Sequence, residues 1–375
     1  MNGFFYNFKS FSYLCKNKYF MGIHAIKIEN YKSIQSAEIL MKPINILIGS
    51  NGSGKSNFIN FFKLLQRIRE QKLQSYVNQH GKADNFLYFG RKKSDFLGGK
   101  ITFDNTPHNN AYEFNLIPTQ TNGFIFDVER SRYSDKSWSF NSGTEESQLK
   151  NYDGFEGDYL RNFMQQFRIF HFHDTGFNSR IKQPCKLNDN VALNEDGSNI
   201  AAFLYKLQEK KPKSLKKIEQ AIRFIAPFFD SFLLKPDELD SKYIELRWTE
   251  NGEEQLFDAH NLSDGTLRMI CLSTLLLQPE KPLTIIIDEP ELGLHPSAIT
   301  YLAAMLKKAS FHSQIIVSTQ SVNLVSEFEA QDIVVVERQN NQSAFKRLDN
   351  ANLEGWLEEY SLGELWEKNI IGGRP

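Results

Sequence analysis

The feature that most constrains this chain is a glycine-rich segment at residues 49–56, which reads GSNGSGKS and fits G-x-x-x-x-G-K-S in full. The apolar run INILIG leads into it and is typical of a strand buried in the middle of a sheet. After it, Phe58, Ile59 and Phe62 recur at helical spacing. Glycines let the backbone N–H groups point inward, and a helix N-terminus adds positive potential at the same point. The order strand, glycine turn, helix therefore predicts a phosphate cradle rather than an incidental turn.

The pattern assigns separate roles within this cradle. Lys55 would bridge the β- and γ-phosphates of ATP, and the Ser56 hydroxyl would ligate Mg²⁺. The candidate nucleotide-binding residues are Gly49, Ser50, Asn51, Gly52, Ser53, Gly54, Lys55, Ser56 and Asn57.

Two adjacent acids follow a second apolar run, LTIIIDEPE, which reads as another buried strand. Ligands of open α/β sheets bind outside the carboxyl ends of the strands, where Asp288 and Glu289 stand. Asp288 would hold Mg²⁺, and Glu289 would orient and deprotonate the attacking water. Glu291 is either a further polar site residue or a solvated turn carboxylate.

A third segment, NLSDGTLRMI at residues 261–270, joins a turn to a helix that Ser263 can cap. Its LSDGT resembles the L-S-G-G-Q signature of ABC-type ATPases. That resemblance implies that Ser263 and Gly265 complete the γ-phosphate site of another subunit, so that two ATP molecules are sandwiched in a homodimer or a higher even oligomer. It also places His295, in GLHPSA, at the dimer seam.

Departures from the transporter pattern indicate the branch of that superfamily. Asp264 and Thr266 replace glycine and glutamine of the signature, as is familiar in SMC-, RecF- and OLD-like proteins. QIIVSTQS resembles the strand that normally ends in a switch histidine, and Gln320 takes that place. A glutamine amide does not take up a proton near pH 7, so we expect slow hydrolysis with Gln320 as a catalytic residue beside Glu289 and Lys55.

The span 21–375 resembles bacterial AAA/ABC-type predicted ATPases of the RecF/OLD/SMC-like kind, through NYKSI, FHFHDT, DGSNIAAFLYKL and the closing YSLGELWEKNIIGGRP. The chain has neither coiled-coil arms nor a TOPRIM nuclease domain after the ATPase pattern. The resemblance therefore implies a regulatory ATPase with a separate effector subunit, a nuclease acting on DNA in anti-phage or mobile-element defence. A RecF-like DNA-binding repair clamp and an ABC transporter nucleotide-binding subunit are the alternatives.

Alternating strands and helices predict an α/β fold, a P-loop ABC-type ATPase head with a mostly parallel central sheet. We expect an antiparallel β meander over about 71–165 and a helical lobe over about 190–260, with helix across 194–235. FRIFHFHDT, residues 167–175, reads as a strand that returns to the main sheet. Residues 1–20 read as a disordered or mis-called extension of the domain at 21–375, with an aromatic docking arm as the alternative.

Several residues outside these motifs remain candidates. His171 and His173 alternate with phenylalanines on the expected strand, as a metal pair or as ordinary strand histidines. His173 or Asp174 stands where the superfamily has a glutamine that contacts Mg²⁺ or water. Asn30 and Lys32 would approach the nucleotide, unless Lys32 is a surface lysine.

The charge of the chain limits its partners. The formal net charge of −1 over 375 residues excludes a polycation built to coat nucleic acid. Contact with DNA would need a local cluster of basic residues, and two candidates are residues 91–93 and residues 206–217. The alternative for residues 206–217 is a solvated face of a helix. Three scattered cysteines indicate a reducing cytoplasm, and no apolar run reaches the roughly 20 residues of a membrane span.

Overall fold

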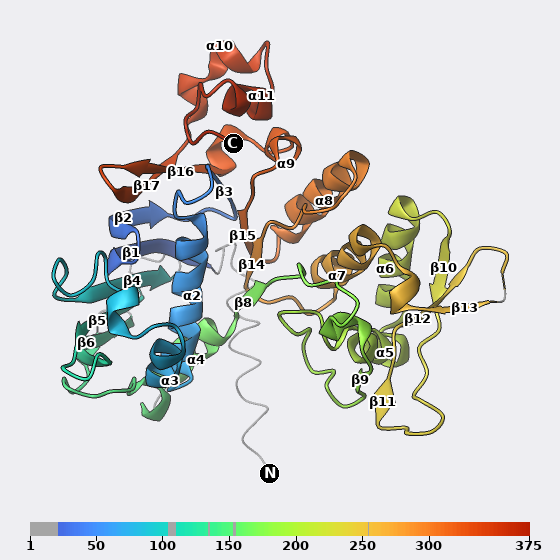
Figure 1. Cartoon of the computed structure of the whole chain (residues 1–375), viewed down its shortest axis with the longest axis horizontal. Helices are drawn as coiled ribbons and strands as arrows, with labels where there is room; N and C mark the ends of the chain where they lie inside the picture. The colour runs from blue at the N-terminus through green and yellow to red at the C-terminus, as the bar shows by residue number, and fades with distance from the viewer. Residues whose placement is uncertain (1–21, 104–109, 134–135, 153–154, 254) are drawn as a thin grey trace. The chain divides into compact units, whose positions relative to one another are not determined.

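The computed structural model describes residues 22–103, 110–133, 136–152, 155–253 and 255–375. The extension expected at residues 1–20 lies outside these ranges. The chain divides into two units (Figure 1). Unit 1 contains the described residues up to Asn45, with Asn51–Phe167 and Val336–Lys346. Unit 2 contains Ile46–Ser50, Arg168–Val335 and Arg347–Pro375.

Unit 1 is built on a six-stranded antiparallel sheet in the order β2-β1-β4-β5-β6-β7. The amino-terminal hairpin thus joins the predicted meander in one sheet. Along β2 and β5 the burial largely alternates between successive residues, as a sheet with one face on the core requires. The strands are β1 (Ile23–Tyr31), β2 (Ile34–Leu40), β4 (Leu97–Phe103), β5 (Ala111–Pro118), β6 (Phe124–Tyr133) and β7 (Lys136–Ser139).

Helix α2 (Lys55–Arg69), which follows the phosphate loop, runs alongside this sheet (Figure 1). Its Phe61 ring stacks on Phe114 of β5 with ring centroids 6.3 Å apart, and Phe62 meets Phe167 edge to face. These buried aromatic contacts fix the helix on the sheet. Unit 1 also contains α3 (Leu73–Gln79), α4 (Phe155–Gln165) and the 3₁₀ turns η1 (Ala83–Asn85) and η2 (Leu149–Asn151).

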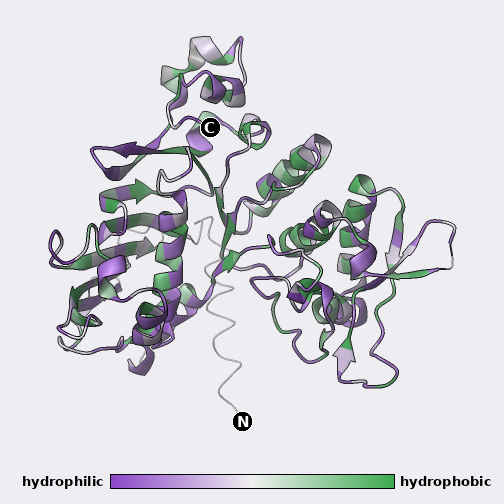
Figure 2. Ribbon diagram, viewed as in Figure 1, coloured by the Kyte–Doolittle hydropathy of each residue, from purple (hydrophilic) through white to green (hydrophobic). Residues whose placement is uncertain are grey.

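A second six-stranded sheet has the order β17-β16-β3-β15-β14-β8. β16 is parallel to β3, and β14 is parallel to β15. β3 and β15 are buried at every residue, as central parallel strands covered on both faces are. Figure 2 shows β14 and β15 in the hydrophobic colour. The strands are β3 (Ile44–Ile48), β8 (Phe167–Phe170), β14 (Thr284–Asp288), β15 (Gln314–Ser318), β16 (Ile333–Gln339) and β17 (Gln342–Arg347).

The remaining elements are helices and short strands that belong to unit 2, and they lie between residues 180 and 332 or between residues 350 and 367. The helices are α5 (Ile200–Lys210), α6 (Pro212–Ile225), α7 (Asp264–Leu277), α8 (Pro296–Ala309), α9 (Val322–Ser326), α10 (Glu354–Leu357) and α11 (Leu362–Glu367). The strands are β9 (Cys185–Lys186), β10 (Phe229–Phe232), β11 (Tyr243–Ile244), β12 (Arg247–Glu250) and β13 (Leu256–Asp258). The 3₁₀ turns are η3 (Arg180–Lys182), η4 (Ala259–Asn261), η5 (Ala330–Asp332) and η6 (Asn350–Asn352). Within the described ranges, no helix combines the length and the apolar character that a bilayer crossing needs.

Two expected elements are shorter than predicted. The strand expected to reach Thr175 ends at Phe170, because the His171 N–H donates to Glu195 O at 2.9 Å instead of continuing the ladder. The helix expected across residues 194–235 breaks at Lys211 and ends at Ile225. Pro227 follows, which favours a break in the helix, and the chain continues as β10.

Gly99 on β4 tests this packing, because a Cβ atom there would lie 2.7 Å from Phe61 on α2 and 2.6 Å from Phe114. We expect Gly99→Ala to lower the free energy of unfolding by about 1–3 kcal/mol, the range for overpacking a filled core. The neighbouring exposed substitution Lys100→Ala should change it by less than about 0.5 kcal/mol. Denaturant titrations of both variants measure the difference, and equal midpoints would contradict the packing.

Candidate active site

The glycine-rich segment forms the loop between β3 and α2. Gly52 and Gly54 have φ angles of 78° and 118°, in the region that side chains with a Cβ rarely adopt. Gly54 is the residue before α2, and Lys55, which is buried, is its first residue. The first four N–H groups of an α-helix have no intrahelical acceptor, so α2 begins where an anion would need donors.

Three hydrogen-bonded side chains of unit 1, from Asn57, Ser33 and Ser343, form a brace that supports this loop. The Asn57 amide donates to Ser33 Oγ at 2.7 Å, Ser33 Oγ and Ser343 Oγ are 2.7 Å apart, and Ser343 Oγ donates to the Ser53 carbonyl at 2.6 Å. Because the single Ser343 hydroxyl proton goes to Ser53, Ser33 donates to Ser343. A Cβ on Gly54 would collide with Ser343 Oγ. The brace therefore gives a second reason for glycine at this position.

In unit 2 the carboxyl ends of three strands meet at one edge. β15 lies between β3 and β14. Asp288 at the end of β14 pairs with Ser318 at the end of β15. The Thr319 N–H, one residue further on, donates to Leu47 O of β3 at 3.0 Å. This edge therefore carries Gly49, Ser50, Asp288, Glu289 and Gln320, in the place where open parallel sheets bind their ligands.

Glu289 is tied to the segment after β15 by its backbone and by its side chain. Its φ of 43° is uncommon for a residue with a Cβ. Its N–H donates to Ser318 O at 2.8 Å, and its carboxylate accepts a hydrogen bond from the Gln320 amide. A residue held in a sparsely populated conformation by its surroundings is common at functional sites.

Glu291 is a buried member of the same network, so the alternative of a solvated turn carboxylate is wrong. It accepts hydrogen bonds from Thr319 Oγ1 at 2.5 Å and from the Gln320 N–H at 3.3 Å. Burial raises the pKa of the Glu291 carboxyl; its hydrogen bonds with Thr319 and Gln320 oppose this shift and the charge of Glu289 adds to it. Glu291 thus holds the backbone of Gln320, whose side chain holds Glu289.

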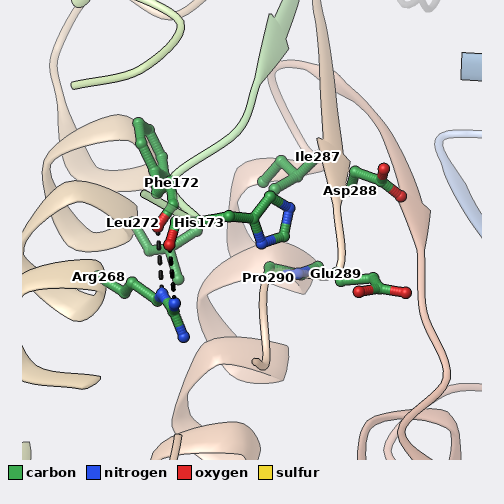
Figure 3. A pocket seen from close by; sticks show the side chains of 8 residues that line it. All are labelled: Phe172, His173, Arg268, Leu272, Ile287, Asp288, Glu289 and Pro290. Carbon is green, nitrogen blue, oxygen red and sulfur yellow. Dashed lines mark hydrogen bonds between the residues drawn. The ribbon is translucent and has the colours of Figure 1, made fainter. Parts of the chain in front are cut away.

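Arg268 of α7 connects three segments beside the acids. Its guanidinium donates to Phe172 O at 3.1 Å, to His173 O at 2.9 Å and to Leu292 O. Figure 3 shows the first two bonds and the pocket next to them, of about 10 Å³, which the His173 ring, Asp288 and Glu289 also line. The space suits about one water molecule.

The signature segment has structural roles within its own chain. Ser263 caps α7, because its Oγ accepts the Thr266 N–H at 3.2 Å. A Cβ on Gly265 would lie 2.7 Å from Gly293 O, so glycine allows two turns to approach closely. His295 caps α8 through Nδ1, which accepts the Ser297 N–H at 3.4 Å. Ser263 and His295 are also exposed to solvent.

Asn30 and Lys32 lie just before Ser33, one of the residues of the loop brace, in the sequence. Lys32 is half-buried with its Nζ 5.6 Å from the ring centres of Tyr31 and Phe86, so it is not an ordinary surface lysine. Burial lowers the pKa of Lys32, and the charge of Lys63 adds to the effect. Asn30 has a φ of 54° and is the second-last residue of β1.

The two basic clusters lie in different units. Arg91 is paired with Asp84 at 2.9 Å, whereas Lys92 and Lys93 are exposed. Residues 206–217 span the end of α5 and the beginning of α6, where Lys211, Lys213, Lys216 and Lys217 are exposed.

Sequence patterns identified the loop and the acids but missed four residues that support them. Ser33 lies in the NYKSI segment, so its neighbourhood was singled out but its role was not. Arg268 follows the signature by two residues. Ser343 and Thr319 carry no local signal, because their importance comes from contacts far away in sequence.

The chain is similar in sequence to a family of AAA domains and to a phage nuclease. A family model described as "AAA domain, putative AbiEii toxin, Type IV TA system" matches residues 44–326. The Old nuclease of Escherichia phage P2 is 24% identical over 371 residues, and the match covers 88% of this chain and 61% of that protein. The chain therefore spans less than two thirds of the length of this curated relative.

Solved structures of SMC heads share the fold. One is the SmcHead bound to the C-winged helix domain of ScpA, with a TM-score of 0.60 and 15% identity. The match covers 90% of this chain and 99% of the SMC head chain. Another is the Smc head domain with an extended coiled coil, derived from Pyrococcus furiosus and bound to the C-terminal domain of ScpA, with a TM-score of 0.55, 14% identity and the same coverage. The predicted α/β fold of a P-loop ATPase head is confirmed.

The brace under the phosphate loop predicts an effect at a residue that would touch no nucleotide. We expect Ser343→Ala to weaken the binding of a non-hydrolysable ATP analogue with Mg²⁺ by about 10-fold, because losing one buried hydrogen bond costs about 1–1.5 kcal/mol. Calorimetric titration measures the affinity, and Ser36→Ala, at an exposed serine of β2, is the matched control. An unchanged affinity for Ser343→Ala would remove the brace from the binding site.

Proposed function

We propose a regulatory role for this chain, which belongs to the AAA-domain family described as "putative AbiEii toxin, Type IV TA system" and is a P-loop ATPase of the OLD- and SMC-like kind. ATP closes a dimer of two chains around two nucleotides, and the dimer controls a separate nuclease that acts on DNA. The observation that carries the proposal is the shared carboxyl edge of β3, β15 and β14, with Gly49 and Ser50 beside Asp288 and Glu289.

The residues at hand suit ATP with Mg²⁺. The loop glycines and Lys55 would hold the phosphates, and Asn51, Ser53 and Asn57 would shape the loop around them. The Ser56 hydroxyl and the Asp288 carboxylate are oxygen donors, the ligand type that Mg²⁺ prefers. Bound Mg²⁺ would neutralise charge on the phosphate oxygens.

Hydrolysis would depend on Glu289. Its carboxylate would take the proton of the attacking water, and the Gln320 amide would fix the orientation of that carboxylate through the hydrogen bond between them. Since the amide itself takes up no proton near neutral pH, Gln320 orients and does not shuttle protons. This arrangement suits a slow ATPase whose bound state is the signal.

Dimer closure would use two signature residues, the exposed Ser263 and the half-buried Gly265. Ser263 and Gly265 stand at the start of α7 and would reach the γ-phosphate of the other subunit, with His295 at the seam. Their capping and packing roles hold both segments in place in the monomer. The effector part of the proposal is supported by the likeness to Old nuclease, a relative that this chain matches over 61% of its length.

Replacing Glu289 should separate binding from turnover. We expect Glu289→Gln to lower kcat for ATP hydrolysis by at least about 100-fold, the usual contribution of a general base, with little change in ATP affinity. Lys55→Ala should lose ATP binding itself. Phosphate release and analogue titration measure the two quantities, with Glu280→Gln at an exposed acid as the matched control. Turnover at the original rate in Glu289→Gln would rule out its role as the base.

The dimer has its own test. In the Glu289→Gln background, ATP with Mg²⁺ should raise the mass measured by light scattering from one chain to two. Adding Ser263→Arg should keep the protein monomeric, because the larger cation would stand where the second γ-phosphate must fit. Ser139→Arg, an exposed serine on β7, should still dimerise. A closed dimer with Ser263→Arg would overturn the role of Ser263 across the interface.

A further inference from the structure

Two histidines and one acid of unit 2 converge beside the sheet edge. His171 and His173 each offer a ring nitrogen and Asp288 offers a carboxylate oxygen, and these three atoms all lie within 4.8 Å of one another. All three side chains are half-buried. In Figure 3 the His173 ring points toward Asp288, which is the last residue of β14.

The fold holds these side chains from two neighbouring elements. β8, which ends one residue before His171, lies next to β14 in the sheet. Phe170 and Phe172 alternate with the histidines and are buried in the core. Because the Phe172 and His173 carbonyls are both held by Arg268, the backbone that carries His173 is fixed before any ligand arrives.

The separation of the three atoms is close to that of ligands on one ion. Bonds from zinc to histidine nitrogen or carboxylate oxygen are about 2.0–2.2 Å, so two ligands on one tetrahedral ion are roughly 3.3–3.6 Å apart. Rotations that move each of these side-chain atoms by about 1 Å would close the difference.

We propose that His171, His173 and Asp288 form a binding site for a divalent transition-metal ion of the zinc class. Two imidazoles and one carboxylate match Zn²⁺ and its neighbours in the first transition row, whereas Mg²⁺ prefers oxygen donors alone. Three protein ligands leave a coordination position for water or another oxygen, as in open rather than structural zinc sites.

Asp288 would be shared between this metal site and the proposed nucleotide site, so metal binding would regulate ATP turnover. A transition-metal ion held by the two imidazoles would occupy the carboxylate that lies next to Glu289 at the same sheet edge. The bound ion would therefore withdraw Asp288 from other partners and place a positive charge beside Glu289. We expect micromolar Zn²⁺ to slow ATP turnover through these histidines.

Metal binding can be measured without nucleotide. Full-length protein without a histidine tag, stripped with a chelator, is titrated with Co²⁺, whose visible absorption strengthens when it enters a site of four or five ligands, and with Zn²⁺ in competition. The wild type should bind one ion per chain. His171→Gln and His173→Gln, made singly, should each lower the Zn²⁺ affinity by about 100-fold or more, since losing even an outer-shell partner costs 10–100-fold.

His312→Gln is the matched control, because His312 is exposed at the opposite end of β15. It should bind Co²⁺ as the wild type does. Thermal melting in chelator shows that each variant is folded, and one folded histidine variant suffices for the test. Weak Co²⁺ absorption in the wild type, or an affinity that neither His171→Gln nor His173→Gln changes, would overturn the proposal.

Discussion

The hydrogen-bonded alignment of β14, β15 and β3 is the constraint on which the candidate site depends. Asp288 pairs with Ser318, and Thr319 bonds Leu47, so β14 and β15 end together with β3, which precedes both by more than two hundred residues. A slip of one residue in either pairing would turn side chains to the opposite face and displace the acids from the loop edge. β3 and β15 are buried at every residue, so both faces of these two strands lie in the core.

Beyond that edge, the acids are held in place by hydrogen bonds of side chains rather than by further strands. Glu291 holds Thr319 and the Gln320 backbone, and the Gln320 amide holds Glu289. Arg268 joins α7 to the segment after β8 and to the turn after Glu291. A displacement of α7, the helix that begins in the signature segment, would therefore also move His173 and the turn that carries the acids. Such contacts connect the surface proposed for dimer closure to the sheet edge that carries the acids.

Local patterns in the sequence were sufficient for much of this arrangement. The apolar runs, the glycine turn and the helical spacing after it located β3, the loop and α2, because each signal is confined to a few adjacent residues. The ends of elements were harder: FRIFHFHDT alternates like a strand throughout, yet a bond from His171 to Glu195 draws the chain away from the sheet. Pro227 was a visible signal that the expected helix would end early.

The brace and the network could not be found in the same way. Ser343 and Ser33 are ordinary serines in sequence, and their value arises from a contact between residues 310 positions apart. Glu291 was ambiguous, because its burial depends on the segment after β15 packing over it. Pairing of this kind is a property of the folded chain and leaves no periodicity to detect.

The distance in sequence between Ser53 and Ser343 also bears on the synthesis of the protein. The complete phosphate-loop motif is made well before the hydroxyl that fixes its Ser53 carbonyl, because Ser343 follows Ser53 by 290 residues. Domains generally fold from the amino end as they emerge. A nascent or truncated chain that stops before β17 would display every residue of the motif with the loop still unsupported. The supported form of the loop would thus arise only once β17 has been made.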